Sequence, residues 1–452
     1  MEMKAFLPAV ITASSICAAT AKSEPVDIAH FKHLFEGDPS TLEHRAAHIK
    51  KNWQDSYAPM LIESLRFSRN NKRSKIYNSI LNEKTGLSKR SDISDYWQWA
   101  WSKPYQPHPK YDDFKAFLYQ RIDPRFEAYF DKSPKSNIRL DEIRWGGVLR
   151  DGIPPLKNPK TLKAEQADYL DDKDIVFGVH FNGRSRAYPK RILAWHEMVK
   201  DTVGGKSING VYCTLCGSMI VYDTKHKGKH YELGTSGFLY RSNKLMYDHK
   251  TESMWSTIEG KPVVGPLVGK GIQLKPLTVV TTTWGEWKRR HPGTTVLSLD
   301  TGHHRDYGEG VAYRSYFATD RLMFQVPDQL KDKRLKNKAS VLALRFGSKP
   351  NDKIAFSPKF LRKNPVYNHQ HGGTKVVILT DSSGASRVYQ SDGINFSTWD
   401  QNHVALDNQG QKWTLTEDGL TSSAGKKLSR FPSHNAFWFG WVSAYPETQL
   451  VQ

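Results

Sequence analysis

Residues 175–223 read IVFGVHFNGRSRAYPKRILAWHEMVKDTVGGKSINGVYCTLCGSMIVYD, and residues 341–390 read VLALRFGSKPNDKIAFSPKFLRKNPVYNHQHGGTKVVILTDSSGASRVYQ. The Gly-Gly pair at 204–205 aligns with the Gly-Gly pair at 372–373. Self-similarity between distant parts of one chain is typical of an internal duplication. Only the first stretch contains cysteines, so the comparison separates what the scaffold needs from what chemistry needs.

A spaced tryptophan pair recurs after each stretch. It occurs in TTTWGEWKRRHPGTTVL and again in NAFWFGWVSAYPETQL, and in both a proline follows the second tryptophan by five positions. Because tryptophan is a rare residue, the paired pattern favours duplication more strongly than the glycines do. We expect a first pseudo-repeat at 138–330, a basic polar link near 328–338, and a second pseudo-repeat at 339–452. The two pairs are Trp284 with Trp287 and Trp438 with Trp441.

The region after residue 138 has the pattern of sheet. Short runs rich in β-branched and aromatic residues alternate with turn signals such as Asn-Gly and Gly-Gly. Short helices are expected at 189–200 and 283–290. The pattern predicts an α+β fold, mainly antiparallel sheet in two tandem pseudo-repeats, preceded by a helical N-terminal region. The expected strands are 175–181, 210–212, 219–222, 278–282, 341–346 and 375–379.

Residues 22–137 show helical periodicity instead. In the segment 112–122, the apolar residues Phe114, Phe117 and Leu118 recur at a spacing that places them on one helix face. We therefore predict a helical N-terminal region, whose aromatic residues form a core rather than a ligand platform. The other amphipathic segments of helical length are 44–53 and 59–67.

The first residues have the composition of an export signal. Lys4 gives a positive start, 5–16 is apolar or small, and Ala19-Thr20-Ala21 supplies a cleavage site. We expect cleavage after Ala21 and a periplasmic or secreted mature protein. A cytosolic helix start and a lipoprotein signal cut before Cys17 are the alternatives. No later run approaches the ~18 apolar residues of a membrane span, so no transmembrane segment is expected in the mature chain.

Composition limits the class of partner. The hydrophobic content of 38% suits a large folded core, and the net charge of +20 is strongly basic. Outside the cytoplasm, this charge favours an anionic surface polymer as partner over nucleic acid, and an unidentified small molecule is the other partner expected. A solvated basic surface with no partner is the alternative.

The motif Cys213-Thr214-Leu215-Cys216 is the strongest chemical signal. Two thiols at this spacing form a redox disulfide or bind a thiophilic metal. A zinc site needs four ligands, and removal of the signal leaves only these two cysteines. Copper or zinc is therefore possible only with further donors, and soft sulfur favours copper. A disulfide here closes a short loop, so a purely stabilising role is poorly motivated.

His196 is the expected third member of the site. It lies on the expected helix before the cysteines, and the second stretch has Asn364 near its position. It serves either as a metal ligand with Cys213 and Cys216 or as the base that holds Cys213 as a thiolate. A hydrogen-bonded structural histidine is the alternative.

Polar residues that follow the cysteines are candidates for a substrate pocket. Tyr247 is the candidate for a catalytic hydrogen bond, and Asp248 for orienting His196 or Arg241. Asp248 has a counterpart in Asp407, which favours a structural role for it. The polar run at 303–307 is expected to be a loop. The candidate substrate-binding residues are Ser236, Gly237, Arg241, Asn243 and Asp248.

Several established catalytic signatures are missing from the sequence. There is no G-x-S-x-G, no Walker loop and no Rossmann fingerprint. His196-Glu197 is followed by Met198, Val199 and Lys200, so the zincin pattern lacks its second histidine.

Five segments together carry a family resemblance: DGIPPL, RAYPKRILAWHEMVKDTVGG, YCTLCGSMIVYD, SGFLYRSNKLMYDHKTESMW and FWFGWVSAYPET. The chain from 151 to 450 resembles a bacterial exported family known as domain of unknown function 3179. The resemblance implies no established activity, and it does not extend to the helical region. The residues that it supports are His196, Cys213, Cys216, Ser236, Gly237, Asn243, Tyr247 and Asp248.

Two functions of different classes follow from these features. The first is an extracytoplasmic protein with a thiol-based copper, zinc or redox site on Cys213, Cys216 and His196. The second is a non-catalytic binding or assembly module in which Cys213 and Cys216 form a structural disulfide. A hydrolase that uses Asp248 or Glu197 is a distant third, because no paired-carboxylate geometry is visible in the sequence. Whether the protein is an enzyme stays open.

Overall fold

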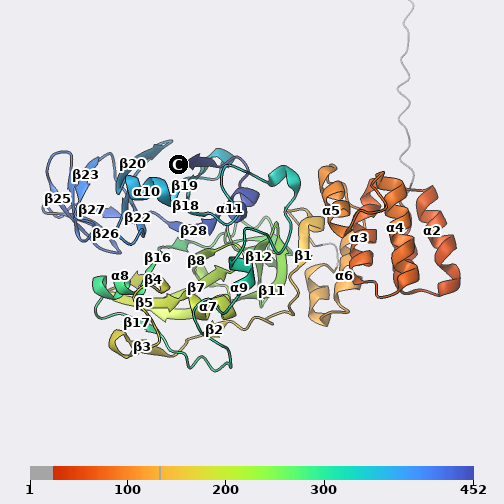
Figure 1. The fold of residues 1–452 in the computed structure, drawn as a ribbon, viewed down its shortest axis with the longest axis horizontal. Coiled ribbons are helices and arrows are strands. Elements are labelled where there is room, and N and C mark those ends of the chain that lie inside the picture. The colour runs from red at the N-terminus through yellow and green to blue at the C-terminus, as the bar shows by residue number, and fades with distance from the viewer. Residues whose placement is uncertain (1–23, 132–133) are drawn as a thin grey trace, which may run out of the picture.

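The computed structural model describes residues 24–131 and 134–452. The expected export signal, its cleavage site and Cys17 lie outside the described residues. Within them, a helical region precedes many antiparallel sheets (Figure 1), which confirms the α+β prediction. No helix in the described ranges combines the length and the apolar character that crossing a membrane requires.

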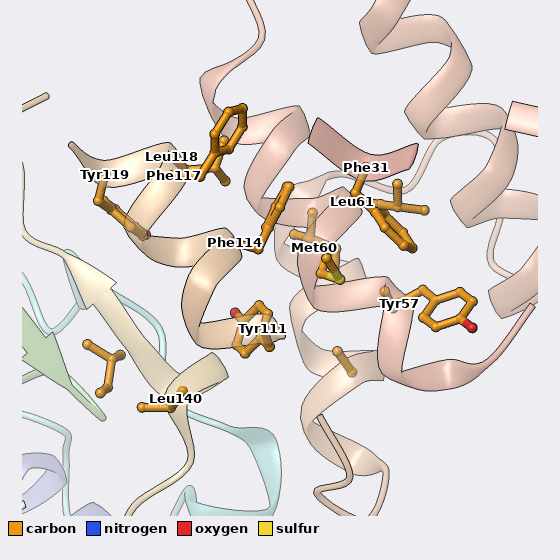
Figure 2. Packing of buried hydrophobic residues seen from close by; sticks show 14 of the residues in the cluster. Phe31, Tyr57, Met60, Leu61, Tyr111, Phe114, Phe117, Leu118, Tyr119 and Leu140 are labelled. Atoms are coloured by element: carbon orange, nitrogen blue, oxygen red, sulfur yellow. The ribbon is translucent and has the colours of Figure 1, made fainter. Parts of the chain in front are cut away.

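The N-terminal region consists of helices that pack around an aromatic core. Rings of Phe31, Tyr57 and Phe114 meet edge to face in this core, and Phe31 and Tyr57 lie 5.2 Å apart. Figure 2 shows these side chains between the helices, and Phe114 lies on the expected apolar face. The helices are α1 (Ile28–Glu36), α2 (Leu42–Lys51), α3 (Ala58–Phe67), α4 (Asn71–Thr85), α5 (Ile93–Ser102) and α6 (Tyr111–Tyr119).

A buried charge pair lies at the junction between the helices and the sheet that contains Ile143 and Phe238. Lys115 donates to Glu63 at 2.7 Å and to the carbonyl of Ile143 at 3.1 Å. The Tyr119 hydroxyl donates to the other Glu63 oxygen at 2.7 Å. Phe238 packs its ring against Tyr119, so the helical core continues into the sheet.

The first half of the β region contains three five-stranded sheets among the described residues. One has the order β16-β4-β5-β17-β3, another β15-β8-β7-β6-β2, and the third β1-β11-β12-β13-β14. The strands of the first are β16 (Val280–Thr283), β4 (Ile175–Phe181), β5 (Arg184–Pro189), β17 (Thr295–Leu297) and β3 (Thr161–Lys163). Those of the second are β15 (Pro276–Leu277), β8 (Ser218–Asp223), β7 (Lys206–Cys213), β6 (Met198–Val203) and β2 (Leu156–Lys157). Those of the third are β1 (Ile143–Trp145), β11 (Leu233–Tyr240), β12 (Asn243–Asp248), β13 (Met254–Ser256) and β14 (Lys261–Val264).

The second half follows with sheets of order β28-β18-β19-β29, β20-β21-β22 and β23-β24-β25-β26-β27. The first of these contains β28 (Ser433–Phe437), β18 (Ser340–Arg345), β19 (Lys353–Phe356) and β29 (Gln449–Val451). The second contains β20 (Val366–His371), β21 (Thr374–Thr380) and β22 (Ser386–Gln390). The third contains β23 (Phe396–Trp399), β24 (Val404–Asp407), β25 (Lys412–Leu415), β26 (Gly419–Ser422) and β27 (Lys427–Ser429).

The two halves have matching local connections. Helix α8 (Trp284–Arg290) joins β16 to β17, and β17 pairs in parallel with β5. Helix α11 (Trp438–Ala444) joins β28 to β29, and β29 pairs in parallel with β19. The second tryptophan of each spaced pair makes the same hydrogen bond, Trp287 to Thr294 at 2.9 Å and Trp441 to Thr448 at 2.8 Å. The scaffold role of these tryptophans is therefore local and the same in both halves.

The helix predicted at 189–200 was wrong at its C-terminal end. Helix α7 (Lys190–His196) ends at His196, and β6 occupies the rest of the segment 189–200. The helix ends because Glu197 adopts a left-handed backbone conformation with φ of 54°. Met198 and Val199 then enter the sheet, where both are buried against β7.

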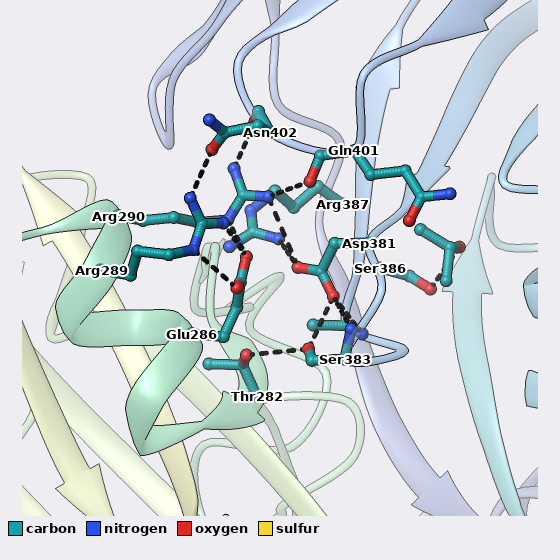
Figure 3. Close-up of polar contacts among 12 residues, drawn as sticks. Thr282, Glu286, Arg289, Arg290, Asp381, Ser383, Ser386, Arg387, Gln401 and Asn402 are labelled. Carbon is teal, nitrogen blue, oxygen red and sulfur yellow. Dashed lines mark hydrogen bonds and ion pairs between the residues drawn. The ribbon is translucent and has the colours of Figure 1, made fainter. Parts of the chain in front are cut away.

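A buried ion cluster joins the two halves (Figure 3). Arg387 on β22 donates to Asp381 at 2.8 Å. It also donates to Glu417 at 2.6 Å. Arg290 on α8 donates to Glu286 at 2.6 Å and lies 3.8 Å from Asp381. Since these side chains are removed from water, each charge depends on its partners.

Glu417→Gln is expected to lower the free energy of unfolding at neutral pH by about 3–5 kcal/mol, because it removes the carboxylate that pairs with the buried Arg430 and leaves Arg387 with Asp381 alone. Burial disfavours the charged form, yet Arg387 and Arg430 hold the pKa of the Glu417 carboxyl well below its usual range. The carboxylate therefore stabilises the fold above its unfolded pKa, and this contribution is lost as the pH falls through the folded pKa. Urea unfolding of both proteins at neutral and acidic pH should show the gap narrowing on acidification. Arg289→Gln, at an exposed neighbour, should change stability by less than about 1 kcal/mol.

Candidate functional site

The two cysteines lie at the turn of the β7–β8 hairpin. Cys213 ends β7, and it forms a disulfide with Cys216 inside the turn. The backbone NH of Cys216 donates to the Cys213 carbonyl at 3.1 Å, which closes the turn. Ser218, the first residue of β8, pairs with Cys213 in the sheet register. The sequence predicted that the cysteines follow a strand, and Cys213 belongs to that strand.

The second half covers this turn. The NH of Phe437 at the end of β28 donates to the Cys216 carbonyl at 2.7 Å. Gly217 has φ of 59°, and a Cβ there would lie 2.7 Å from the Phe437 ring. A Cβ at Gly440 of α11 would lie 3.1 Å from the Cys216 Cβ. The close approach of these backbones therefore needs glycine on both sides.

Cys213 lines a small pocket of about 60 Å³. This space holds a few water molecules or one short side chain. Cys213 is 2% exposed and Cys216 is fully buried, so Cys213 is the sulfur on the pocket side. The wall is mainly apolar and contains four polar residues. The lining residues are Gly146, Val148, Ile153, Glu197, Cys213, Leu215, Thr235, Gly237, Phe238, Leu239, Lys244, Tyr313, Met323 and Phe324.

A charge pair lies in the wall of the same pocket. Lys244 on β12 donates to Oε2 of Glu197 at 2.7 Å, and the Tyr313 hydroxyl donates to Oε1 at 3.1 Å. Glu197 and Lys244 are each buried, with about one-twentieth of their surface exposed. The left-handed turn at Glu197 ends α7 and places this carboxylate in the pocket. Burial raises the pKa of the Tyr313 hydroxyl, and the Glu197 carboxylate raises it further, so Tyr313 stays a hydrogen-bond donor at neutral pH.

Several buried polar atoms around the turn have no hydrogen-bond partner within the described residues. One is Oδ1 of Asn243, which flanks Gly440 together with Cys216. Another is Oγ1 of Thr214, inside the turn. The Sγ of Cys216 lies 3.4 Å from the carbonyl oxygen of Ser242. An unsatisfied buried polar group is rare enough to need an explanation, and a change of redox state is one. A third atom of this kind is the Oγ of Ser218, the residue that pairs with Cys213.

His196 does not point to the sulfur atoms. Its Nδ1 lies 2.9 Å from the Pro154 carbonyl and its Nε2 lies 2.6 Å from the Tyr307 hydroxyl. Because a carbonyl only accepts, Nδ1 carries the proton and Nε2 accepts from Tyr307. Among the described residues, no three Cys, His, Asp or Glu side chains converge as metal ligands. The copper or zinc set expected from Cys213, Cys216 and His196 therefore does not fit this arrangement.

The other expected site residues divide between the turn and the scaffold. Gly237 lines the pocket, and Asn243 donates to the Gly440 carbonyl at 3.0 Å beside Cys216. Ser236 instead donates to the Leu245 carbonyl at 2.6 Å, within its own sheet. Arg241 forms an ion pair with Glu142 at the boundary with the helical region.

Tyr247 and Asp248 are held by contacts away from the cysteines. The Tyr247 hydroxyl donates to Asp151. Asp248 accepts from the indole NH of Trp255 at 3.1 Å, and its counterpart Asp407 accepts from Trp413 at 2.9 Å. The structural interpretation of Asp248 is thus the one that the geometry favours.

The family of the chain follows from a match that spans most of its length. Residues 150–448 match the family described as Protein of unknown function (DUF3179). The chain belongs to this family. No curated protein and no solved structure matches the chain. The family region contains the cysteine turn, Glu197, Lys244 and Tyr313, whereas helices α1–α6 precede it.

Lys244 and Tyr313, which line the pocket beside Cys213, were not identified from the sequence. Lys244 is a charged residue inside a buried strand, and this was the one signal that could have singled it out. Tyr313 precedes the short helix α9 (Arg314–Phe317) and has φ of 56°. No local sequence pattern predicts this backbone conformation. Glu197 was considered only for a hydrolase.

His196→Asn is expected to weaken the dependence of the free energy of unfolding on pH below about pH 6.5. Burial lowers the pKa of His196 from 6.5 to about 4, so the unfolded chain binds a proton that the folded chain excludes. Stability from this group is therefore full above pH 6.5 and falls between pH 6.5 and 4, by about 3 kcal/mol. Urea unfolding at pH 7 and pH 5 measures the slope. The variant should lose this part of the slope, while His304→Asn, at an exposed position, should keep it. An unchanged slope in His196→Asn contradicts the assignment.

Proposed function

We propose that this protein is an extracytoplasmic thiol–disulfide exchange protein whose reactive pair is Cys213 and Cys216. One observation carries the proposal: the Cys213 side of the disulfide faces a small pocket that also contains a buried carboxylate–ammonium pair. A small, mainly apolar pocket with a few converging polar groups beside a reactive group is the usual setting of a functional site.

A purely stabilising disulfide explains the surroundings less well. The two cysteines are three positions apart, so the bond removes little chain entropy from the unfolded state. The carbonyl oxygen of Ser242 lies 3.4 Å from the Sγ of Cys216 and can accept from a thiol S–H. This acceptor suits the dithiol state as well as the disulfide state.

The exchange reaction balances without any further co-reactant. The Cys213 thiolate attacks one sulfur of a substrate disulfide, forms a mixed disulfide and releases one substrate thiolate. The Cys216 thiolate then attacks Cys213 Sγ, restores the internal disulfide and releases the second thiolate. Two protons leave the cysteines and two are taken up by the released thiols. The protein pair is oxidised by two electrons, and the substrate is reduced by two. The reverse sequence oxidises a substrate dithiol.

We further propose that the two halves are tandem pseudo-repeats, at 138–330 and 339–452. The matching strand orders, the parallel β17 and β29 pairings and the Trp–Thr and Asp–Trp hydrogen bonds support this. In the second half, Thr380 and Ser383 occupy the cysteine positions. The neighbouring Asp381 belongs to the ion cluster instead. The chemistry is therefore assigned to the first half alone.

Location and partners complete the proposal. An export signal cleaved after Ala21 would deliver the protein to the periplasm or the exterior, where a disulfide persists. The net charge of +20 favours an anionic surface polymer as the partner, and a small molecule is the other candidate. We do not propose nucleic acid as a partner. A copper or zinc cofactor stays a prediction from the sequence, and it would require reduced cysteines and a donor other than His196.

The second candidate is a non-catalytic binding or assembly module with a structural disulfide. The burial of both sulfurs favours it, since Cys216 has no exposed surface. The two candidates differ in whether the bond opens and closes without loss of the fold.

Titration of the mature protein with dithiothreitol separates them. We expect reversible reduction, with two alkylatable thiols gained on reduction and lost on reoxidation, counted by mass spectrometry after iodoacetamide treatment. Near-ultraviolet circular dichroism should show the same fold in both states. A bond that resists dithiothreitol until the protein unfolds would favour the structural disulfide.

Cysteine variants test which sulfur attacks. Cys216→Ser should keep Cys213 facing the pocket and accumulate a mixed disulfide with 4,4′-dithiodipyridine. Cys213→Ser should react at least about ten times more slowly, because Cys216 is buried under Phe437 and Gly440. Release of thiopyridone at 324 nm follows the reaction. Equal rates in the two variants would overturn the assignment of Cys213.

A further inference from the structure

The thiol–disulfide exchange of Cys213 and Cys216 also requires a proton acceptor. Three observations connect the Glu197 carboxylate to that reaction. Glu197 and Cys213 line the same pocket. The carbonyl of Glu197 accepts from the NH of Tyr212 at 2.9 Å, which ties its backbone to the residue before Cys213. Its backbone φ of 54° is unfavourable for a non-glycine residue, and strain of this kind is found at functional sites.

We propose that Glu197 is the proton-transfer residue of the cysteine pair: it accepts the proton of Cys213 when this thiol attacks and returns it to the departing thiol. The proposal rests on the exchange function proposed above. It assigns a catalytic role to the second residue of the His196-Glu197 motif rather than to the first.

The surroundings suit a carboxylate in this role. Near neutral pH, a thiol in a mainly apolar pocket has only a few water molecules to take its proton, so a carboxylate supplied by the protein makes the proton transfer faster. Lys244 donates to Oε2 of this carboxylate, and the Tyr313 hydroxyl occupies one lone pair of Oε1. Each carboxylate oxygen has a second acceptor site, so a proton can be received without breaking these bonds.

The other titratable groups near the pocket are less suited. The amine of Lys244 is a donor already used by Glu197. Tyr313 donates its hydroxyl proton to the same carboxylate, and His196 uses both ring nitrogens for Pro154 and Tyr307. Glu197 is the acceptor that remains among the lining residues.

The proton balance closes over one full exchange. Glu197 takes the Cys213 proton, and the Cys213 thiolate attacks the substrate disulfide. The first released thiolate takes that proton, which leaves Glu197 ionised again. Glu197 then takes the Cys216 proton as Cys216 attacks Cys213 Sγ, and the second released thiolate receives it. No net charge remains in the pocket at the end.

Replacement of the pair as a unit tests the proposal. Glu197→Gln alone would leave a buried ammonium without its partner, so the double variant Glu197→Gln with Lys244→Met is preferred. The reduced protein is mixed with 4,4′-dithiodipyridine, and thiopyridone release is recorded between about pH 6 and pH 9. We expect a rate about 100-fold below that of the native protein near pH 6.5. The two rates should converge near pH 9, where solvent removes the thiol proton, because an ordinary Cys has a pKa of about 8.5.

The chain offers a matched control in the helical region. Glu63 accepts from Lys115 and from the Tyr119 hydroxyl, the same three residue types in the same roles, with no cysteine nearby. The double variant Glu63→Gln with Lys115→Met removes a comparable buried pair. Its exchange rate should equal that of the native protein at every pH.

Three other results would contradict either the role of Glu197 or the exchange function itself. A loss of rate that is the same at all pH values would show that Glu197 only supports the fold of the pocket. Native rates in the Glu197 double variant would remove its role while leaving the exchange function in place. A native dithiol that does not react with the probe at any pH would overturn both the exchange function and this proposal.

Discussion

Two opposite charges without surrounding water persist only as a pair, and Glu197 with Lys244 is such a pair. The ammonium comes from β12 in the third sheet, and the carboxylate comes from the end of α7, ahead of the second sheet. Their contact therefore fixes how these elements meet, because separation would leave a desolvated charge on each side. Glu197 and Lys244 both line the pocket beside Cys213, so the pocket lies where this contact joins the two sheets.

The second constraint is the close packing of the two halves. Phe437 and Gly440 approach the cysteine turn so closely that Gly217 has no room for a side chain. In the opposite direction, Thr282 of β16 lies 3.4 Å from Ser383, in the turn between β21 and β22. The turns of both hairpins are thus covered by the other half. One of these junctions holds a disulfide and the other a cluster of arginines and carboxylates (Figure 3).

Sequence patterns recovered the parts that depend on neighbouring residues. The helical face of Phe114, the strand before Cys213 and the paired role of Asp248 and Asp407 are all local, and the structure agrees with them. The position of Glu197 was not recovered, because a left-handed turn at a glutamate breaks the local preference that predicted a longer helix. Lys244 and Tyr313 are distant from it in sequence, and only the packing of separate sheets brings them to one carboxylate. His196 was expected at the sulfurs, but its two ring nitrogens contact the Pro154 carbonyl and the Tyr307 hydroxyl instead.

The coverage of the cysteine turn has a consequence for biosynthesis. During synthesis the hairpin of β7 and β8 is complete long before the residues around 437–440 have been made. Throughout that interval, the two thiols have no lid from the second half. The two thiols are therefore accessible to other molecules before β28 and α11 pack over the turn, and are largely buried afterwards. The order of chain synthesis thus gives the cysteines a period of exposure that the finished fold does not.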